Sequence, residues 1–157
     1  MSLTRPSTAV PAILWCTLIA GTLDMSDALI YTYLRGGKPY NVLLFIASGM
    51  LGPKAFSGGP EVALLGLAFH FLIIITAATI YYAASREIPF LNRNAVLSGL
   101  VYGGIIYLFM NKIVLPLSHT AKPTGPPPMI SLVNGVLAVV LFVGLTIALI
   151  VRRFSTR

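Results

Sequence analysis

Four long apolar stretches, separated by shorter segments rich in Gly, Pro and charged residues, dominate the pattern along the chain. They cover residues 10–34, 62–84, 95–115 and 129–151. Each is long enough for an α-helix that crosses a hydrocarbon core of roughly 30 Å, which takes about 20 residues. Because a chain in lipid must satisfy its backbone hydrogen bonds internally, these stretches predict transmembrane helices. We expect an all-α polytopic membrane protein in which residues 1–157 form a single domain, a four-helix bundle.

A shorter apolar run covers residues 40–51, between the first two predicted spans. It follows Pro39 and ends at Gly52 and Pro53, and it is too short to cross a bilayer. We expect a short helix that either lies in the membrane interface or re-enters the membrane. Further on, Pro60 and Glu61 suit the start of a helix, because proline is favoured at the first helical position and the helix dipole favours an acid there.

The composition supports a membrane location. Of the 157 residues, 57% are hydrophobic and only 10% are charged, and the mean hydropathy is +0.88. The formal net charge of +7 would suggest nucleic acid in a soluble protein. Here the basic residues lie at the ends of the apolar stretches, where they are explained by membrane topology and phospholipid head groups. We therefore expect a lipid bilayer and no nucleic acid as a partner.

The basic residues form two groups, which alternate between the two predicted membrane faces. One group holds Arg5, Arg86, Arg93, Arg152, Arg153 and Arg157, and the other holds Arg35, Lys38, Lys54, Lys112 and Lys122. The larger group predicts that both termini are cytoplasmic, because Lys and Arg are enriched in cytoplasmic loops. The first apolar stretch runs on to Leu34, longer than a signal-peptide core, so we expect it to be a retained span.

Ionisable residues inside the predicted spans are the main candidates for function. Asp24 and Asp27 lie one helical turn apart in the first span, and a carboxyl group in a bilayer core is costly. With a rise of about 1.5 Å per residue, His70 is level with Asp24, and three further polar residues lie nearer the same membrane face. We predict one intramembrane polar site, formed by Asp24, Asp27, His70, Tyr107, Asn111 and Asn134.

Small residues on the predicted helices indicate how the helices pack, since small side chains let helix backbones approach closely. Gly99 and Gly103 form a G-x-x-x-G pattern in the third span. The glycines that we expect at helix contacts are Gly21, Gly66, Gly99, Gly103 and Gly135.

Three interpretations of the polar site remain open. Its side chains could serve as interhelical hydrogen bonds, or form a path for protons or cations. Alternatively, Asp24, Asp27 and His70 could hold a divalent ion. No cofactor is implied, since a bis-histidine haem would need His119, which lies in a proline-rich loop. Cys16 is the only cysteine, which excludes a disulfide within the chain.

Several short motifs carry a family resemblance. They include AGTLD at residues 20–24, IASGMLG at 46–52, AFSGG at 55–59 and YYAASR at 81–86. In these motifs the chain resembles an uncharacterised family of small four-span bacterial inner-membrane proteins. The resemblance implies a bacterial inner-membrane location and four spans, and it implies no reaction. Asp27 is not part of the family pattern.

Motifs of soluble enzymes, such as a phosphate-binding loop or a zinc-protease helix, are absent from the sequence. We therefore expect a non-catalytic accessory or structural subunit, which packs against itself or against the subunits of a larger bacterial membrane complex. The alternative is a carrier or channel for protons, cations or a small solute that uses Asp24, Asp27 and His70. A lipid-directed enzyme with His70 as base is a third interpretation.

Overall fold

The chain folds into helices. The structure is a computed structural model that describes residues 8–120 and 125–155, and in these two ranges it contains no strand. Four of its helices are long and apolar enough to span a membrane: Ala9–Leu34, Pro60–Glu87, Ala95–Leu117 and Met129–Ser155. The prediction of an all-α chain with four membrane-spanning helices is confirmed. Arg5, Lys122 and Arg157, used above to predict the topology, lie outside the described residues.

The first two spans are uninterrupted α-helices, α1 (Ala9–Leu34) and α3 (Pro60–Glu87). The third span is divided into α5 (Ala95–Phe109), the π-helical segment η2 (Met110–Val114) and α6 (Leu115–Leu117). The fourth is divided into α7 (Met129–Ala138), the π-helical segment η3 (Val139–Leu145) and α8 (Thr146–Ser155). The sequence pattern predicted neither π-helical segment.

Short elements connect the spans. The predicted short helix is α2 (Tyr40–Leu51), and the 3₁₀ segment η1 (Gly52–Ser57) follows it. The turn between them places Gly52 at a φ of 68°, which glycine adopts without the steric cost of a Cβ. A second short helix, α4 (Pro89–Arg93), joins α3 to α5. It was not predicted.

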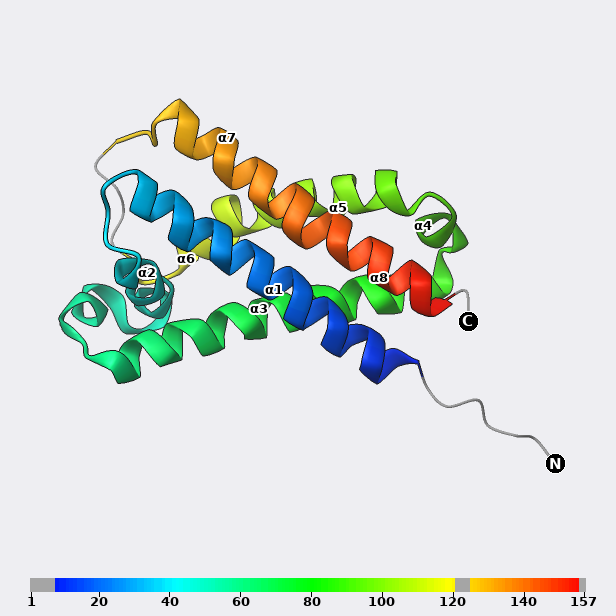
Figure 1. The fold of residues 1–157 in the computed structure, drawn as a ribbon, viewed down its shortest axis with the longest axis horizontal. Helices are drawn as coiled ribbons and strands as arrows, with labels where there is room; N and C mark the ends of the chain where they lie inside the picture. Colours follow the sequence, from blue (N-terminus) through cyan, green and yellow to red (C-terminus); the bar gives the residue numbers. More distant parts are fainter. Residues whose placement is uncertain (1–7, 121–124, 156–157) are drawn as a thin grey trace.

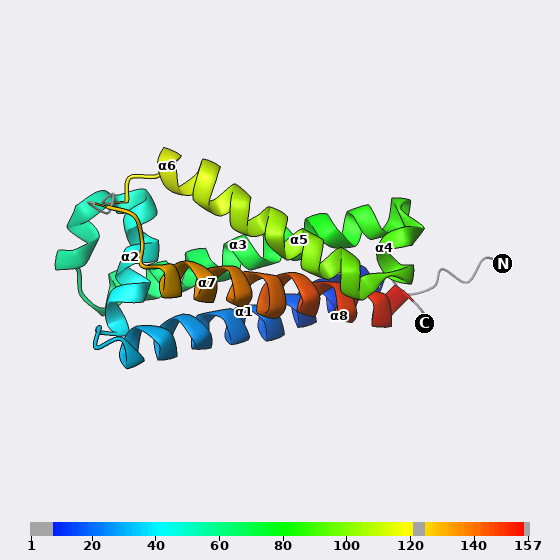
Figure 2. The same ribbon diagram turned by 90° about the horizontal axis from the view of Figure 1, so that it is seen from above.

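The two ends of the molecule differ in what they contain (Figure 1). The start of α1, the end of α8 and the connector α4 lie at one end, which we call the chain-end half. The end of α1, α2 and the start of α7 lie at the other, which we call the α2 half. In the α2 half, α2 runs across the direction of the long helices, and α6 stands apart from the layer of α1 and α7 (Figure 2).

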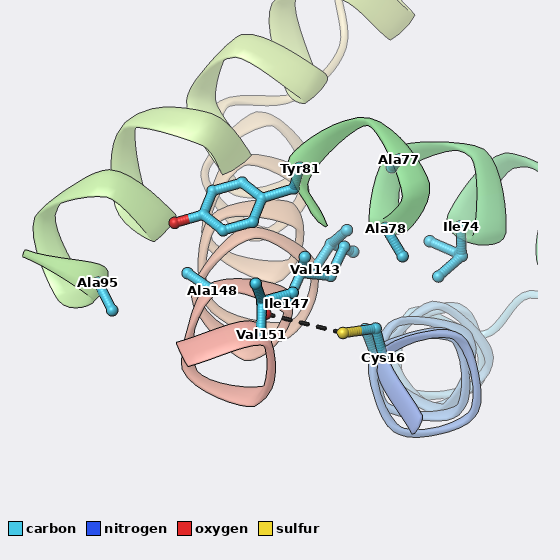
Figure 3. Close-up of a cluster of buried hydrophobic side chains, with 11 residues drawn as sticks. Cys16, Ile74, Ala77, Ala78, Tyr81, Ala95, Val143, Ile147, Ala148 and Val151 are labelled. Atoms are coloured by element: carbon cyan, nitrogen blue, oxygen red, sulfur yellow. Dashed lines mark hydrogen bonds between the residues drawn. The ribbon is translucent and has the colours of Figure 1, made fainter. Parts of the chain in front are cut away.

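A compact apolar core extends from the chain-end half to the middle of the bundle (Figure 3). Cys16, Tyr81, Ile147, Ala148 and Val151 are all buried in it, together with smaller side chains from α3 and α5. The Cys16 thiol lies 3.7 Å from the backbone carbonyl oxygen of Ile147, which it reaches as a weak donor. This core joins α1, α3, α5 and the fourth span.

Glycines bring α5 against η3, the element on which α5 packs most extensively. A Cβ added to Gly103 would lie 2.6 Å from Val140 Cα, and one added to Gly99 would lie 2.8 Å from Leu145 Cα. Gly144 faces the same two glycines from η3. The two helices therefore meet backbone to backbone, an arrangement typical of G-x-x-x-G contacts between helices.

Candidate functional site

His70 is buried in the middle of α3 and connects that helix to α1. Its Nε2 atom lies 2.9 Å from the backbone carbonyl oxygen of Gly21. A carbonyl oxygen only accepts, so His70 Nε2 carries the hydrogen and donates it. The phenyl ring of Phe71 packs over Gly21, where an added Cβ would lie 2.6 Å from its Cε1 atom. His70 therefore acts as an interhelical donor, and the absence of a side chain at Gly21 permits this close packing.

Two further hydrogen bonds join α1 to α7. The Asn134 side-chain amide donates to Asp27 Oδ2 at 2.9 Å. One turn further along α1, the Tyr31 hydroxyl lies 2.7 Å from the Ser131 hydroxyl. These pairs connect residues about 100 positions apart in the sequence, and all four side chains are at least partly buried.

Asp24 differs from its neighbours because no described residue donates a hydrogen bond to its carboxyl group. The group is partly buried and close enough to His70 and Asp27 to interact with both electrostatically. His70 Nε2 is directed to Gly21 and Asp27 is bonded to Asn134. Of the three residues Asp24, Asp27 and His70, Asp24 is therefore the one whose side chain has no hydrogen bond to another described residue.

Asp24 lines a cavity of about 510 Å³ in the α2 half, which we call the main cavity. The cavity lies among α1, α2, α3, the third span and η3, and it is partly open to the surroundings. Ser118 and Thr120 lie in its wall. Most of its wall is apolar and includes Phe45, Ile46, Phe69, Ile73, Ile106 and Val143.

A smaller cavity of about 230 Å³ lies between α1 and α7, and we call it the side cavity. Its wall is more polar and includes Asp27, Tyr31, Ser131 and Asn134. Asp24, Ala28, Val42 and Val139 line both cavities. The two cavities therefore adjoin, and Asp24 lies where they meet.

Two predicted site residues lie elsewhere. Asn111 is exposed, and its side-chain amide donates to the carbonyl oxygen of Tyr107 in its own helix. The Tyr107 ring packs over Gly135, where an added Cβ would lie 3.4 Å from Tyr107 Cε2. Neither residue lines either cavity. The structure thus does not bring these two residues into the cavity walls beside Asp24, because membrane depth alone does not determine which side of a helix a residue occupies.

The divalent-ion interpretation finds no support in the geometry. Within residues 8–120 and 125–155, no three His, Cys, Asp or Glu side chains lie close enough together to hold a metal ion. Asp24, Asp27 and His70 share a region of the bundle, but two of the three already have other partners.

The glycines singled out in the sequence all lie at contacts. Gly66 meets the backbone of α2 at Leu43, and the positions of Gly21, Gly99, Gly103 and Gly135 are described above. Gly144 was not singled out, although it is the partner of Gly99 and Gly103. A lone glycine within an apolar run was the only signal for it.

Most of the residues that line the cavities were not predicted from the sequence. Phe45 and Val143 lie in apolar runs and carry no signal that separates a cavity wall from a lipid-facing surface. Tyr102 was also missed, and its hydroxyl donates to the Ala77 carbonyl oxygen at 2.7 Å, which joins α5 to α3 beside the core.

Comparison of this chain with protein-family models, with curated proteins and with solved structures finds no match. The resemblance to the four-span bacterial family therefore stays a prediction.

Proposed function

We propose that this protein binds a small, membrane-partitioned molecule in the main cavity, with Asp24 as its polar anchor, in the manner of a carrier or a receptor. The observation that carries the proposal is the cavity itself. Its volume of about 510 Å³ falls in the range of small-molecule sites, which are mostly apolar with a few placed polar groups. A largely apolar wall with one carboxyl group that accepts no hydrogen bond from residues 8–120 and 125–155 meets that description.

The neighbouring polar residues differ from Asp24, because their hydrogen bonds already explain them as contacts between helices. His70 and Asn134 both bond to a neighbouring helix, which is the ordinary role of intramembrane polar groups. Asp24 has no such bond to any residue that the structure describes, yet a carboxyl group is costly in a membrane. A ligand-binding role gives a reason for Asp24 that helix packing does not supply.

A cavity-filling variant tests this proposal. An added Cβ at Gly49 would meet only Ser118 Cβ, at 3.9 Å, so the longer side chain of Gly49→Leu has room to extend into the main cavity. Gly104→Leu is the matched control, because a Cβ there meets nothing within 4 Å and Gly104 lines neither cavity.

The protein is purified gently from its native membrane, and the retained small molecules are extracted and identified by mass spectrometry. We expect a molecule retained at near-equimolar amount by the wild type and by Gly104→Leu, and lost from Gly49→Leu. Equal retention by all three proteins, or retention by none, would overturn the proposal.

A second candidate, the accessory subunit, is supported by the exposure of the third span. In the most apolar 18-residue stretch of this span, only 6% of the residues are buried, against 28–33% in the corresponding stretches of the other three spans. A helix whose side chains are so largely exposed is suited to packing against another membrane protein or a second copy. Stoichiometric co-purification of other subunits in mild detergent would support this role, and a monodisperse monomer would exclude it.

The resemblance and the basic residues support a location in a bacterial inner membrane with cytoplasmic chain ends. Arg86 in α3, Arg93 in α4 and Arg152 in α8 belong to the larger basic group, all within elements of the chain-end half. Single cysteines introduced at Glu87 and at Lys54, in a Cys16→Ser background, test the orientation. Labelling by an impermeant maleimide from the outside is expected at position 54 only.

A further inference from the structure

We infer that the ligand of this site is an amphipathic cation, with its positive head group beside Asp24 and its apolar tail in the main cavity. This inference rests on the proposed binding function and names the chemical class of the ligand.

The charges around the cavities favour a cation. Asp24 and Asp27 are both in the walls, whereas no Lys or Arg of the described chain lines either cavity. A carboxylate taken out of water loses several kcal/mol of solvation, and an opposite charge held against it offsets part of this cost. A cationic head group supplies that charge, whereas an anionic head group adds a repulsion. The one basic side chain among the described residues of the walls, His70, already directs its Nε2 hydrogen to the Gly21 carbonyl oxygen.

The division into two adjoining cavities matches a molecule with two chemically different ends. Asp24 lies at the junction, the polar side chains Asp27, Tyr31 and Ser131 lie in the side cavity, and the main cavity is largely apolar. The side cavity also offers the ring of Tyr31, and aromatic faces attract organic cations. A head group at the junction therefore lies beside the Asp24 carboxyl group, with the polar side chains and Tyr31 of the side cavity beyond it, while its tail lies among the apolar side chains of the main cavity.

Three ligands with the same tail and different charges test this inference. The full-length protein is reconstituted in nanodiscs with decyltrimethylammonium, decanol or decanoate at equal mole fractions, and its unfolding temperature is measured. A ligand that binds only the folded protein and is near-saturating raises that temperature by about 5 °C for a chain of this size. We expect this shift with decyltrimethylammonium alone.

Two carboxyl variants identify the anchor. Asp24→Asn is expected to lose most of the shift, and Glu87→Gln, which removes an exposed carboxyl group outside both cavities, is expected to keep it. The unfolding temperature of each variant without ligand reports whether it folds. If Asp24→Asn does not fold, Gly49→Leu replaces it as the variant that should lose the shift.

The outcomes separate the two proposals. A shift with decanol equal to that with the cation, and unchanged in Asp24→Asn, would overturn the cationic ligand while leaving a binding cavity. A shift with decanoate alone would also overturn it. If no ligand of any charge shifts the unfolding temperature and no molecule is retained on purification, the binding function itself is wrong.

Discussion

The two halves of the bundle are built from similar apolar residues but pack differently. In the chain-end half, Cys16, Tyr81 and Ile147 are buried in a continuous core, and α5 meets η3 through glycines. In the α2 half, the same long helices enclose two adjoining cavities, whose walls contain Asp24, Asp27 and His70. Hydrophobicity does not distinguish the halves, since both are apolar. The voids do: the α2 half contains close backbone contacts too, such as Gly66 against Leu43, but it also contains both cavities.

This difference follows from what holds helices together in lipid. Lipid tails are as apolar as the helices, so association depends on close van der Waals packing and on hydrogen bonds. Close packing in the chain-end half comes from Gly99, Gly103 and Gly144. Hydrogen bonds between helices in the α2 half come from His70 and Asn134. The close packing of the chain-end half leaves little space, whereas the hydrogen-bonded contacts of the α2 half lie beside cavities with room for a ligand.

The largest expected effect comes from enlarging a glycine in the tightly packed half. A Cβ in Gly103→Ala would lie 2.6 Å from Val140 Cα and 2.9 Å from the Val139 carbonyl oxygen, so α5 and η3 must separate. We expect a loss of about 3 kcal/mol in the free energy of unfolding, as for overpacked cores. The measurement is a denaturant titration in detergent micelles.

The neighbouring residue supplies the control for this variant. A Cβ at Gly104 meets nothing within 4 Å, so Gly104→Ala should be neutral, or stabilising by up to about 1 kcal/mol because alanine favours the helix. Equal losses at positions 103 and 104 would contradict the contrast drawn between the two halves.

A smaller effect is expected from His70→Leu in the α2 half. The variant keeps an apolar side chain of similar size and removes the donor to the Gly21 carbonyl oxygen, a bond worth about 1 kcal/mol in a membrane. Thr76→Val is the control on the same helix, because the Thr76 hydroxyl bonds only to Leu72 of its own helix. A loss as large as that of Gly103→Ala would mean that the α2 half depends on this hydrogen bond as strongly as the chain-end half depends on close packing.

The pair between Asp27 and Asn134 is expected to be weaker still. A double-mutant cycle of Asp27→Ala and Asn134→Ala should give a coupling energy of about 0.6 kcal/mol, the average for such bonds in a membrane protein. A second cycle, of Asp27→Ala with Ser131→Ala, should give less, because Ser131 bonds to Tyr31. Coupling of equal size in both cycles would indicate that the residues act through a general loosening of α1 against α7.

The sequence was sufficient for the fold because lipid imposes a simple rule on length and polarity. It predicted four spans, and the short helix at residues 40–51 matches α2 (Tyr40–Leu51). It did not predict the π-helical segments η2 and η3, since these depend on how one helix accommodates another. Where the polar residues formed no periodic pattern, the sequence also did not predict which way a side chain points around its helix.

The polar site shows the same limit. Asp24 and His70 were predicted to be level, and both line the main cavity. The cavity could not be predicted, because a void results from the shapes of many apolar side chains and no residue type marks it. Asn111 and Asn134 were both assigned to the site because of their depth in the membrane. Only Asn134 faces α1, where it bonds to Asp27.

The smallest change in the free energy of unfolding is expected from Asn111→Ala. This variant tests whether Asn111 has a structural role within the chain. The Asn111 amide bonds to Tyr107 within its own helix and is exposed, so its loss should change the free energy of unfolding by less than about 0.5 kcal/mol. Ligand retention should be unchanged as well, because Asn111 lines neither cavity. Asn134→Ala is the matched comparison, since it removes the same side chain from an interhelical bond. If Asn111→Ala costs more than Asn134→Ala, then Asn111 has a partner outside this chain, which would favour an accessory subunit that packs along the third span.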